Sequence, residues 1–320
     1  MRMTVGSRKR VPEPAAEGSP AAVLPQRRRR RLTNGLRHAL GVSRRRSLYG
    51  DALNILFLGL LSVLMIIPML YVVSNSLKPL NELYLYPPRF FVQHPTLDNF
   101  RDLVTLMSNT WVPMSRYFFN TIFITVVGTA LHVIFASMAA YVLEKHRFHG
   151  QELFFTTVTL ALLFSSTVTM IPNYIILSKL KLIDTYGAVL LSAVGSPMGA
   201  FLMKQFMSNV HDSLLEAAKI DGAGEVRIFF RIVMPSVKPA WLTLIIFSVQ
   251  TLWNSNGGIA IRSEELKPLS YALSQIAAGG IARAGAAAAV SVVMMIVPIA
   301  VFIITQSNIL ETMAMSGIKE

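Results

Sequence analysis

Six stretches of this chain are apolar for long enough to cross a lipid bilayer. A helix needs about 20 mostly apolar residues to span the hydrocarbon layer. The hydrophobic pattern predicts spans at about residues 52–77, 118–143, 153–177, 187–206, 239–253 and 286–306, of which the fifth is short. Pro68 lies inside the first span, where neighbouring helices can satisfy the carbonyl group that it frees. We therefore predict an all-α, polytopic membrane protein with six transmembrane helices.

A polar segment of about residues 207–238, which we call the polar loop, separates the fourth and fifth spans. Ser213 and Glu216 have the spacing of a capping box, in which each side chain satisfies a free amide at a helix start. Gly222 lies where a helix of about two turns needs a left-handed residue at its end, and Pro235 ends the segment that follows. We expect a helix, a tight turn and a second helix.

Composition places the chain in a membrane independently of this pattern. It is 53% hydrophobic, with a mean hydropathy of +0.51, which is too apolar for a soluble domain of 320 residues. The formal net charge of +13 is concentrated at one end, because residues 1–50 carry thirteen Lys and Arg against two Glu. We predict that residues 1–50 are a disordered basic segment that meets anionic membrane lipid, and that residues 51–320 are the transmembrane domain. No aromatic residue is interleaved with the arginines, so we expect no nucleic-acid partner.

The arginine-rich segment also predicts the orientation of the chain. Such charge holds an N-terminus in the cytoplasm. Six crossings then return the C-terminus to the cytoplasm, and the polar loop lies on the same side. We therefore expect a multi-pass protein of the cell (plasma or inner) membrane with both termini and the polar loop inside.

The polar loop resembles the "EAA" loop in permease subunits of bacterial ABC importers. The matching residues are Glu216, Ala217, Ala218, Gly222, Ile232 and Pro235, while Met234 replaces the usual leucine. Further matches to the carbohydrate-uptake branch are Ser76-Leu-Lys-Pro79, Pro95–Phe100, Asn120-Thr121, Ala140–Phe148, Trp253-Asn254 and Lys267-Pro-Leu269. The chain is similar to the smaller maltose-type permease from about Ala52 to its end, although Asn256 departs from the usual aromatic residue.

This resemblance implies the fold of binding-protein-dependent ABC importer permeases and a role in sugar import. In that family the loop is the coupling helix, which lies in a groove of a cytoplasmic ATPase dimer. A second related permease and an extracytoplasmic solute-binding protein are the other implied partners. The coupling residues would be Glu216, Ala217, Ala218, Asp221, Gly222, Ile232 and Pro235. We expect the small Ala217 and Ala218 to allow close approach of the partner, although Glu216 could equally serve only as a cap.

The chain carries no recognisable catalytic machinery of its own. It has no phosphate-binding Gly-x-x-x-x-Gly-Lys-Ser/Thr loop, no His-Glu-x-x-His, no Gly-x-Ser-x-Gly and no cysteine. We expect no catalytic residue, metal site or cofactor, so a partner must hydrolyse ATP.

A neutral sugar stripped of water needs replacement hydrogen-bond donors and acceptors along its path. The candidates for this path are Asn120, Thr125, Ser166, Thr169, Asn173, Gln250 and Asn254. Each could instead bond to its own helix or to a neighbouring helix. His132 is the conspicuous ionisable residue within the spans, and it is either a transport residue or a self-satisfied histidine. The alternative function is an ion-coupled or facilitated carrier, which the shortage of acidic residues in the spans disfavours.

Overall fold

The structure is a computed structural model that describes residues 48–108, 112–280 and 283–316. The chain forms two units, Met1–Met65 and Ile66–Glu320. The first contributes the start of α2 (Leu48–Ser76), so helix begins just before the predicted boundary at residue 50. Residues 1–47, which hold nearly all of the predicted basic segment, lie outside the described residues.

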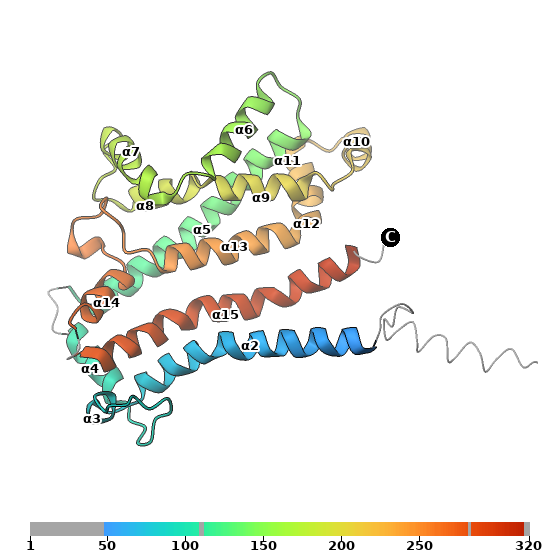
Figure 1. The fold of residues 1–320 in the computed structure, drawn as a ribbon. Helices are drawn as coiled ribbons and strands as arrows, with labels where there is room; N and C mark the ends of the chain where they lie inside the picture. Colours follow the sequence, from blue (N-terminus) through green and yellow to red (C-terminus); the bar gives the residue numbers. More distant parts are fainter. Residues whose placement is uncertain (1–47, 109–111, 281–282, 317–320) are drawn as a thin grey trace, which may run out of the picture. The chain divides into compact units, whose positions relative to one another are not determined.

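Throughout the described ranges the regular elements are helices, as the apolar pattern predicts. After α2 they are α3 (Leu80–Leu83), α4 (Asp98–Ser108), α5 (Met114–Lys145), α6 (Gln151–Ala161), α7 (Ser166–Lys179), α8 (Tyr186–Val194), α9 (Pro197–Met207), α10 (Asp212–Ile220), α11 (Glu225–Ile228), a π-helix (Phe229–Val233), α12 (Met234–Ser236), α13 (Lys238–Trp253), a 3₁₀ turn (Glu264–Leu266), α14 (Leu269–Ala277) and α15 (Ala284–Ser316) (Figure 1).

Four of the predicted spans correspond, in the described residues, to helical segments that are long and apolar enough to cross a membrane. They are Ala52–Ser76, Met114–Lys145, Tyr186–Met207 and Ala284–Gln306, each close to the predicted bounds. The third of these pairs α8 with α9, with Gly195 and Ser196 at the junction. The sequence therefore locates these apolar segments to within a few residues.

The other two predicted spans differ from straight helices. Residues 153–177 form α6 and α7, which are bent by 117° at residues 162–165, and α12 and α13 are bent by 81° at Val237. Four to six crossings are therefore possible by length and composition, depending on whether each bent pair forms one span. A hydropathy pattern does not predict such breaks. Ser165 and its apolar neighbours can form either a turn or a helix, so their composition does not distinguish the two.

α5 lies at the centre of the unit Ile66–Glu320. It packs against α8, α9 and α13, and α13 packs in turn against α15 (Figure 1). A hydrogen bond of 3.1 Å from the Trp253 indole N–H to the Met294 carbonyl fixes the last pair. The three packed helices around α5 hold its buried side in place along most of its length.

Two apolar cores lie at opposite ends of α5, and we name them after the sides of the membrane that the sequence analysis predicts. The outer core joins the start of α5 to α4, α14 and the start of α15, through residues such as Leu103, Tyr117 and Leu273. The inner core joins the end of α5 to α9, α13 and the polar loop, through residues such as Met207 and Leu215. The polar loop is thus packed against the transmembrane helices by apolar contacts as well as by polar ones.

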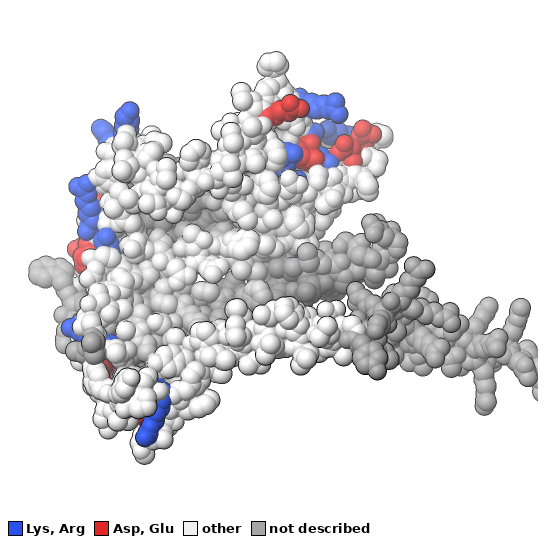
Figure 2. All heavy atoms as spheres, in the orientation of Figure 1, with Lys and Arg blue, Asp and Glu red and all other residues white. Residues whose placement is uncertain are grey.

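Charged side chains are separated by a broad uncharged region. On the face shown in Figure 2, they gather over α10 and α11 and, at the other end, beside α7 and α14. Large apolar side chains are exposed between these ends, including Leu163 (80%) and Ile171 (63%). An uncharged zone between two charged ends is what a helix bundle presents to a bilayer.

Candidate functional site

The first helix of the polar loop begins two residues earlier than the capping-box prediction, which places the N-cap at Ser213. α10 starts at Asp212 with His211 at the N-cap, and no side chain makes a capping hydrogen bond. The predicted capping box is therefore wrong, and Ser213 lies inside the first turn. The carboxylate of Asp212 favours this start, because a negative charge stabilises the amide end of a helix and its Oδ1 bonds to Lys145 Nζ at 2.7 Å.

The end of α10 confirms the predicted left-handed turn. Gly222 has φ +77°. Its N–H donates to the Lys219 carbonyl at 3.0 Å, and the Ala223 N–H donates to the Ala218 carbonyl at 2.9 Å. These two bonds form a Schellman motif, which satisfies carbonyl groups that a helix end would otherwise leave free. The turn reverses the chain into Gly224, after which α11 begins.

α10 has one face in the protein and one face in solvent. Leu215 and Ala218 are buried in the inner core. Glu216, Ala217 and Ile220 are exposed, and Ile220 is 86% exposed. Residues three or four apart share a face of a helix, so these three residues make one exposed stripe. Ala217 is therefore open to a partner, whereas Ala218 is small because its own chain packs against it.

The remaining predicted coupling residues follow this stripe along the loop. Asp221 and Pro235 are exposed, and Ile232 is partly buried against the inner core. The helical run ends at Ser236, one residue after Pro235. A π-helix precedes this point, and the missing N–H of Pro235 prevents regular α-helical bonding there. The predicted helix, turn and second helix are therefore present, with an irregular second helix.

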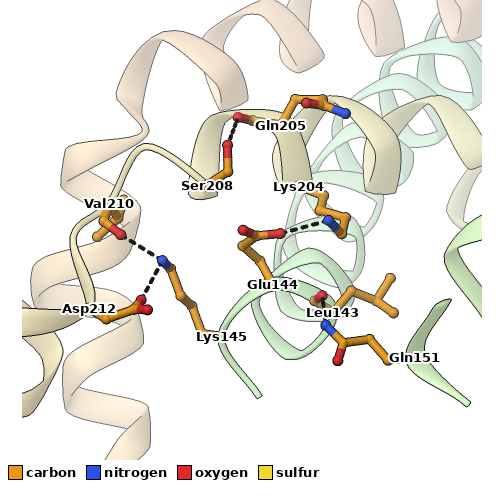
Figure 3. A network of polar contacts seen from close by, with 9 residues as sticks. All are labelled: Leu143, Glu144, Lys145, Gln151, Lys204, Gln205, Ser208, Val210 and Asp212. Atoms are coloured by element: carbon orange, nitrogen blue, oxygen red, sulfur yellow. Dashed lines mark hydrogen bonds and ion pairs between the residues drawn. The ribbon is translucent and has the colours of Figure 1, made fainter. Parts of the chain in front are cut away.

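A polar network holds the start of the polar loop against the end of α5 (Figure 3). Lys145 Nζ donates to the Val210 carbonyl at 2.6 Å and contacts Asp212 at 2.7 Å, and its side chain is only 6% exposed. Next to it, Lys204 of α9 pairs with Glu144 at 2.7 Å. The hydrogen bond from Lys145, together with its charge, lowers the pKa of Asp212. Lys145 therefore fixes both the backbone and the first carboxylate of the loop.

Glu225 fixes the second half of the loop to the same helix. Its Oε2 accepts a hydrogen bond of 2.7 Å from the Tyr141 hydroxyl and lies 3.8 Å from His146 Nε2. Its Oε1 pairs with Lys219 Nζ at 2.7 Å. One carboxylate thus joins α5, α10 and α11. These contacts explain how a polar segment keeps a single shape at the end of the bundle.

The predicted path residues fall on three helices. Asn120 and Thr125 are buried on α5, Ser166, Thr169 and Asn173 are exposed on α7, and Gln250 and Asn254 are exposed at the end of α13. The residues on α7 share one helix face by spacing, but within this single chain they do not form one lining with those on α5. The predicted set is therefore distributed between a buried group and two exposed groups.

Several of these side chains make the local bonds that the alternative interpretation predicts. The Thr169 hydroxyl bonds to the Ser166 carbonyl at 3.2 Å, and the Asn254 amide bonds to the Gln250 carbonyl at 2.8 Å. Asn173 instead reaches Ser192 of α8 at 3.0 Å. Each such bond still leaves acceptor or donor capacity on an exposed side chain.

Asn120 connects α5 to the segment that follows α13. Its amide donates to the carbonyls of Glu265 and Lys267, both at 2.8 Å, and its oxygen accepts from the Tyr186 hydroxyl at 2.6 Å. Both N–H groups and the oxygen of Asn120 therefore have partners within the chain, which is the arrangement that the alternative interpretation predicts. Thr125, by contrast, has a buried hydroxyl without a hydrogen-bond partner in the described residues.

His132 lies at a junction of three helices. Its Nδ1 is 2.8 Å from the Ser248 hydroxyl of α13. On its other side is Gly199 of α9, where a Cβ would come within 2.4 Å of the His132 Nε2 atom. Gly199 is therefore required for this close approach. The described residues contain no group of three His, Asp or Glu side chains that could hold a metal ion.

The sequence analysis did not identify Asp184, which organises the side opposite the polar loop. Its carboxylate accepts hydrogen bonds from the Ser263 hydroxyl and from the backbone N–H groups of Arg262 and Ser263, the latter two at 2.9 and 2.8 Å. The Ser263 hydroxyl, followed by these N–H groups, lowers the pKa of Asp184. A signal was available in the sequence, because Asp184 lies in a short link between apolar segments.

Comparison with known proteins agrees with this architecture. Residues 132–314, more than half of the chain, match the family "Binding-protein-dependent transport system inner membrane component". The chain is 33% identical to Protein LplC of Bacillus subtilis over 71% of this chain and 75% of LplC. It is 32% identical to the arabinooligosaccharides transport system permease protein AraQ of the same organism, over 72% of this chain and 82% of AraQ.

A third relative and a solved structure extend the comparison. The diacetylchitobiose uptake system permease protein NgcG of Streptomyces coelicolor is 30% identical over 68% of this chain and 70% of NgcG. The fold matches a chain in the crystal structure of a bacterial ABC transporter that imports the acidic polysaccharide alginate. That match has a TM-score of 0.68 and 24% identity, and it covers 83% of this chain and 98% of the other.

These relatives give no support to the alternative of an ion-coupled carrier. The match to the family covers the polar loop, the bent α12 and α13 and the final span together. The chain belongs to the family of inner-membrane components of binding-protein-dependent transport systems, the permeases of ABC importers.

Proposed function

We propose that this chain is the permease subunit of an ATP-driven importer for a sugar or oligosaccharide, and that its polar loop docks on a cytoplasmic ATPase. The observation that carries the proposal is the exposed stripe of α10, Glu216, Ala217 and Ile220, held in a fixed orientation by Lys145 and by the inner core. Ile220 is 86% exposed, so the stripe offers an apolar side chain that a partner could cover.

The chemistry of the stripe fits a groove on a partner protein. Ala217 lets the partner approach the helix backbone, Ile220 offers an apolar anchor, and Glu216 offers a charge at the edge. A helix whose exposed residues recur at three- and four-residue spacing commonly binds in this way. Asp221, Gly222 and Pro235 lie beyond the stripe on the same exposed loop and extend the proposed contact.

The proposed cargo is a sugar because several relatives are named for saccharides. AraQ is named for arabinooligosaccharides, NgcG for diacetylchitobiose and YtcP of Bacillus subtilis for polygalacturonan and rhamnogalacturonan. The exposed hydroxyl and amide groups on α7 and at the end of α13, including Asn173 and Gln250, are suitable partners for sugar hydroxyls. A second permease subunit would bring a matching lining opposite these helices, and a solute-binding protein would deliver the cargo from outside.

Co-purification of the chain from its native membrane tests this proposal. We expect an ATPase, a second related permease and a sugar-binding protein to accompany it. Ala217→Trp should then reduce the amount of ATPase retained, because the indole holds the partner away from α10. Ala277→Trp, which changes an exposed alanine of α14, is the matched control and should not affect retention. A wild-type chain that purifies without any ATPase would contradict the proposed function.

A further inference from the structure

α5 is attached by tyrosine–glutamate hydrogen bonds at both of its ends. Near its first turn, the Tyr117 hydroxyl donates to Glu264 Oε1 at 2.6 Å. Near its last turn, the Tyr141 hydroxyl donates to Glu225 Oε2 at 2.7 Å. Glu225 belongs to the polar loop, and Glu264 belongs to the last outer loop, residues 254–285, which follows α13. A single helix therefore binds the two segments that flank α13 in the sequence.

Each tyrosine is part of a larger attachment. At the outer end, the Thr121 hydroxyl accepts the Leu269 N–H at 2.7 Å, in addition to the two bonds from Asn120 to the carbonyls of Glu265 and Lys267. At the inner end, Lys145 bonds to the Val210 carbonyl and to Asp212. Both attachments involve backbone groups of the loops, so a shift of either loop along the helix axis breaks several bonds together.

The helix between these attachments is built to stay straight. α5 has 32 residues, with Pro113 at its N-cap and no proline within it, so it extends for about 48 Å at 1.5 Å per residue. Proline lies inside α2, α7 and α15, at Pro68, Pro172 and Pro298. Kinks in helices occur mostly at proline or at irregular turns. α13 is only 16 residues long and is bent from α12, so it is less suited to carry a displacement between the two loops.

We propose that α5 is a connecting rod that couples the last outer loop to the polar loop, with Tyr117 and Tyr141 as its positioning residues. This inference rests on the proposed function, in which the outer loop faces the binding-protein side and the polar loop faces the ATPase. Nucleotide-driven movement of the polar loop is transmitted through the Glu225 carboxylate to α5, and from Tyr117 to the segment Glu264–Leu269. The coupling element is thus a packed helix with discrete attachments at both sites.

The chain contains no cysteine, so a single reporter can be placed on it. Glu265→Cys puts a label at an exposed position of the outer loop. The whole transporter, purified with its ATPase and embedded in lipid nanodiscs, is labelled with a spin label and trapped with MgATP and orthovanadate. The same transporter without Glu265→Cys provides the blank. The measured quantity is the trapping-induced change in the label spectrum per trapped nucleotide.

Tyr117→Phe and Tyr141→Phe each remove one hydroxyl and keep the ring. We expect each to weaken the equilibrium that couples the two loops about fivefold, the factor that corresponds to one hydrogen bond, and so to reduce the spectral change. Tyr174→Phe is the control, because that hydroxyl on α7 bonds to Arg262 and not to α5. Glu264→Gln and Glu225→Gln weaken the same two bonds from the acceptor side and replace either tyrosine variant that fails to assemble.

A normal response in either tyrosine variant would overturn the connecting rod, because the proposed series arrangement needs both attachments. An equal loss in Tyr174→Phe would overturn it as well, since the effect would then not belong to α5. These outcomes are distinct from failure of the proposed function, in which the wild-type chain would bring no ATPase and trap no nucleotide.

Discussion

Gly222 lies in a turn of the polar loop whose backbone conformation is unfavourable for other residues. Its φ of +77° is unfavourable for a residue with a side chain, yet a Cβ built there meets nothing within 4 Å. Gly222→Ala should therefore cost only about 1–2 kcal/mol of local stability. Gly222→Asp adds a carboxylate beside the proposed docking stripe, and we expect it to lower ATPase affinity well beyond the alanine variant. ATPase binding to the purified permease measures the difference.

Gly150 supplies the control for this prediction. It also has positive φ (+91°) and open space around it, but it precedes α6. Gly150→Asp should produce a similar local strain without the loss of ATPase affinity. Equal losses at Gly150 and Gly222 would contradict a specific role for the turn of the polar loop.

Asp184 gives a prediction for the pH dependence of stability. Because hydrogen bonds from the Ser263 hydroxyl and from nearby N–H groups lower its pKa in the folded state, Asp184 stabilises the fold fully above the ordinary aspartate pKa of about 4. This stabilisation decreases as the pH falls from that value towards the lower folded-state pKa. Thermal unfolding in detergent at a series of acidic pH values should show a steeper loss for wild type than for Asp184→Asn.

The exposed Asp102 of α4 provides the comparison for Asp184. Asp102→Asn should retain the acid-dependent loss that Asp184→Asn removes. If wild type and Asp184→Asn lose stability in parallel, the link between Asp184 and the segment Arg262–Ser263 does not contribute to stability. Both residues lie in polar segments between apolar helices, so the test concerns folding and not the proposed transport path.

At the scale of the element, two adjacent leucines show which face of α10 packs against the protein. Leu215 is 6% exposed in the inner core, whereas Leu214 is 48% exposed. Leu215→Ala should destabilise the packing of the polar loop by about 2–5 kcal/mol, the usual cost for a buried leucine. Leu214→Ala should cost much less. Protease cleavage of the polar loop in the purified protein reports the difference, and equal cleavage rates would contradict the observed face of α10.

Hydropathy located the elements well but did not predict their breaks. The continuous apolar helices could be read from composition, because the bilayer demands that length. The bends at residues 162–165 and at Val237 depend on tertiary packing and are absent from any local pattern. The start of α10 was missed for a similar reason, since the contact of Asp212 with Lys145 spans 67 positions of the sequence.

The candidate site was predictable where its chemistry is local. Gly222 and the exposed Ala217 follow from a short helix and a tight turn, which adjacent residues specify. Burial of Ala218 and the bonds of Tyr141 to Glu225 could not be predicted, because they require knowing which helix lies next to the loop. Asn120 shows the same limit, since its partners Tyr186, Glu265 and Lys267 are 66, 145 and 147 positions away.

At the scale of the whole molecule, the proposed mechanism depends on the two ends of the helices facing opposite sides of a membrane. Charged side chains occur at both ends, with an uncharged region between them (Figure 2). The polar loop lies at one end of α5, and Glu264 and Glu265 lie at the other, joined to Tyr117, Arg116 and Asn120. If this arrangement is correct, a reagent on one side of the membrane should label the polar loop, and a reagent on the other side should label the loop that contains Glu264 and Glu265.

The absence of cysteine makes this topology directly measurable. In intact cells, a membrane-impermeant thiol reagent should label Glu265→Cys and Arg89→Cys, which lie at exposed positions on the proposed outer side. Gly222→Cys should react only after the membrane is permeabilised, because the polar loop must face ATP. Both results follow from the length of α5. Its 32 residues extend for about 48 Å, which is more than the roughly 30 Å thickness of the hydrocarbon layer. Labelling of Gly222→Cys from outside would remove the polar loop from the ATPase side and would contradict the proposed coupling and the connecting rod together.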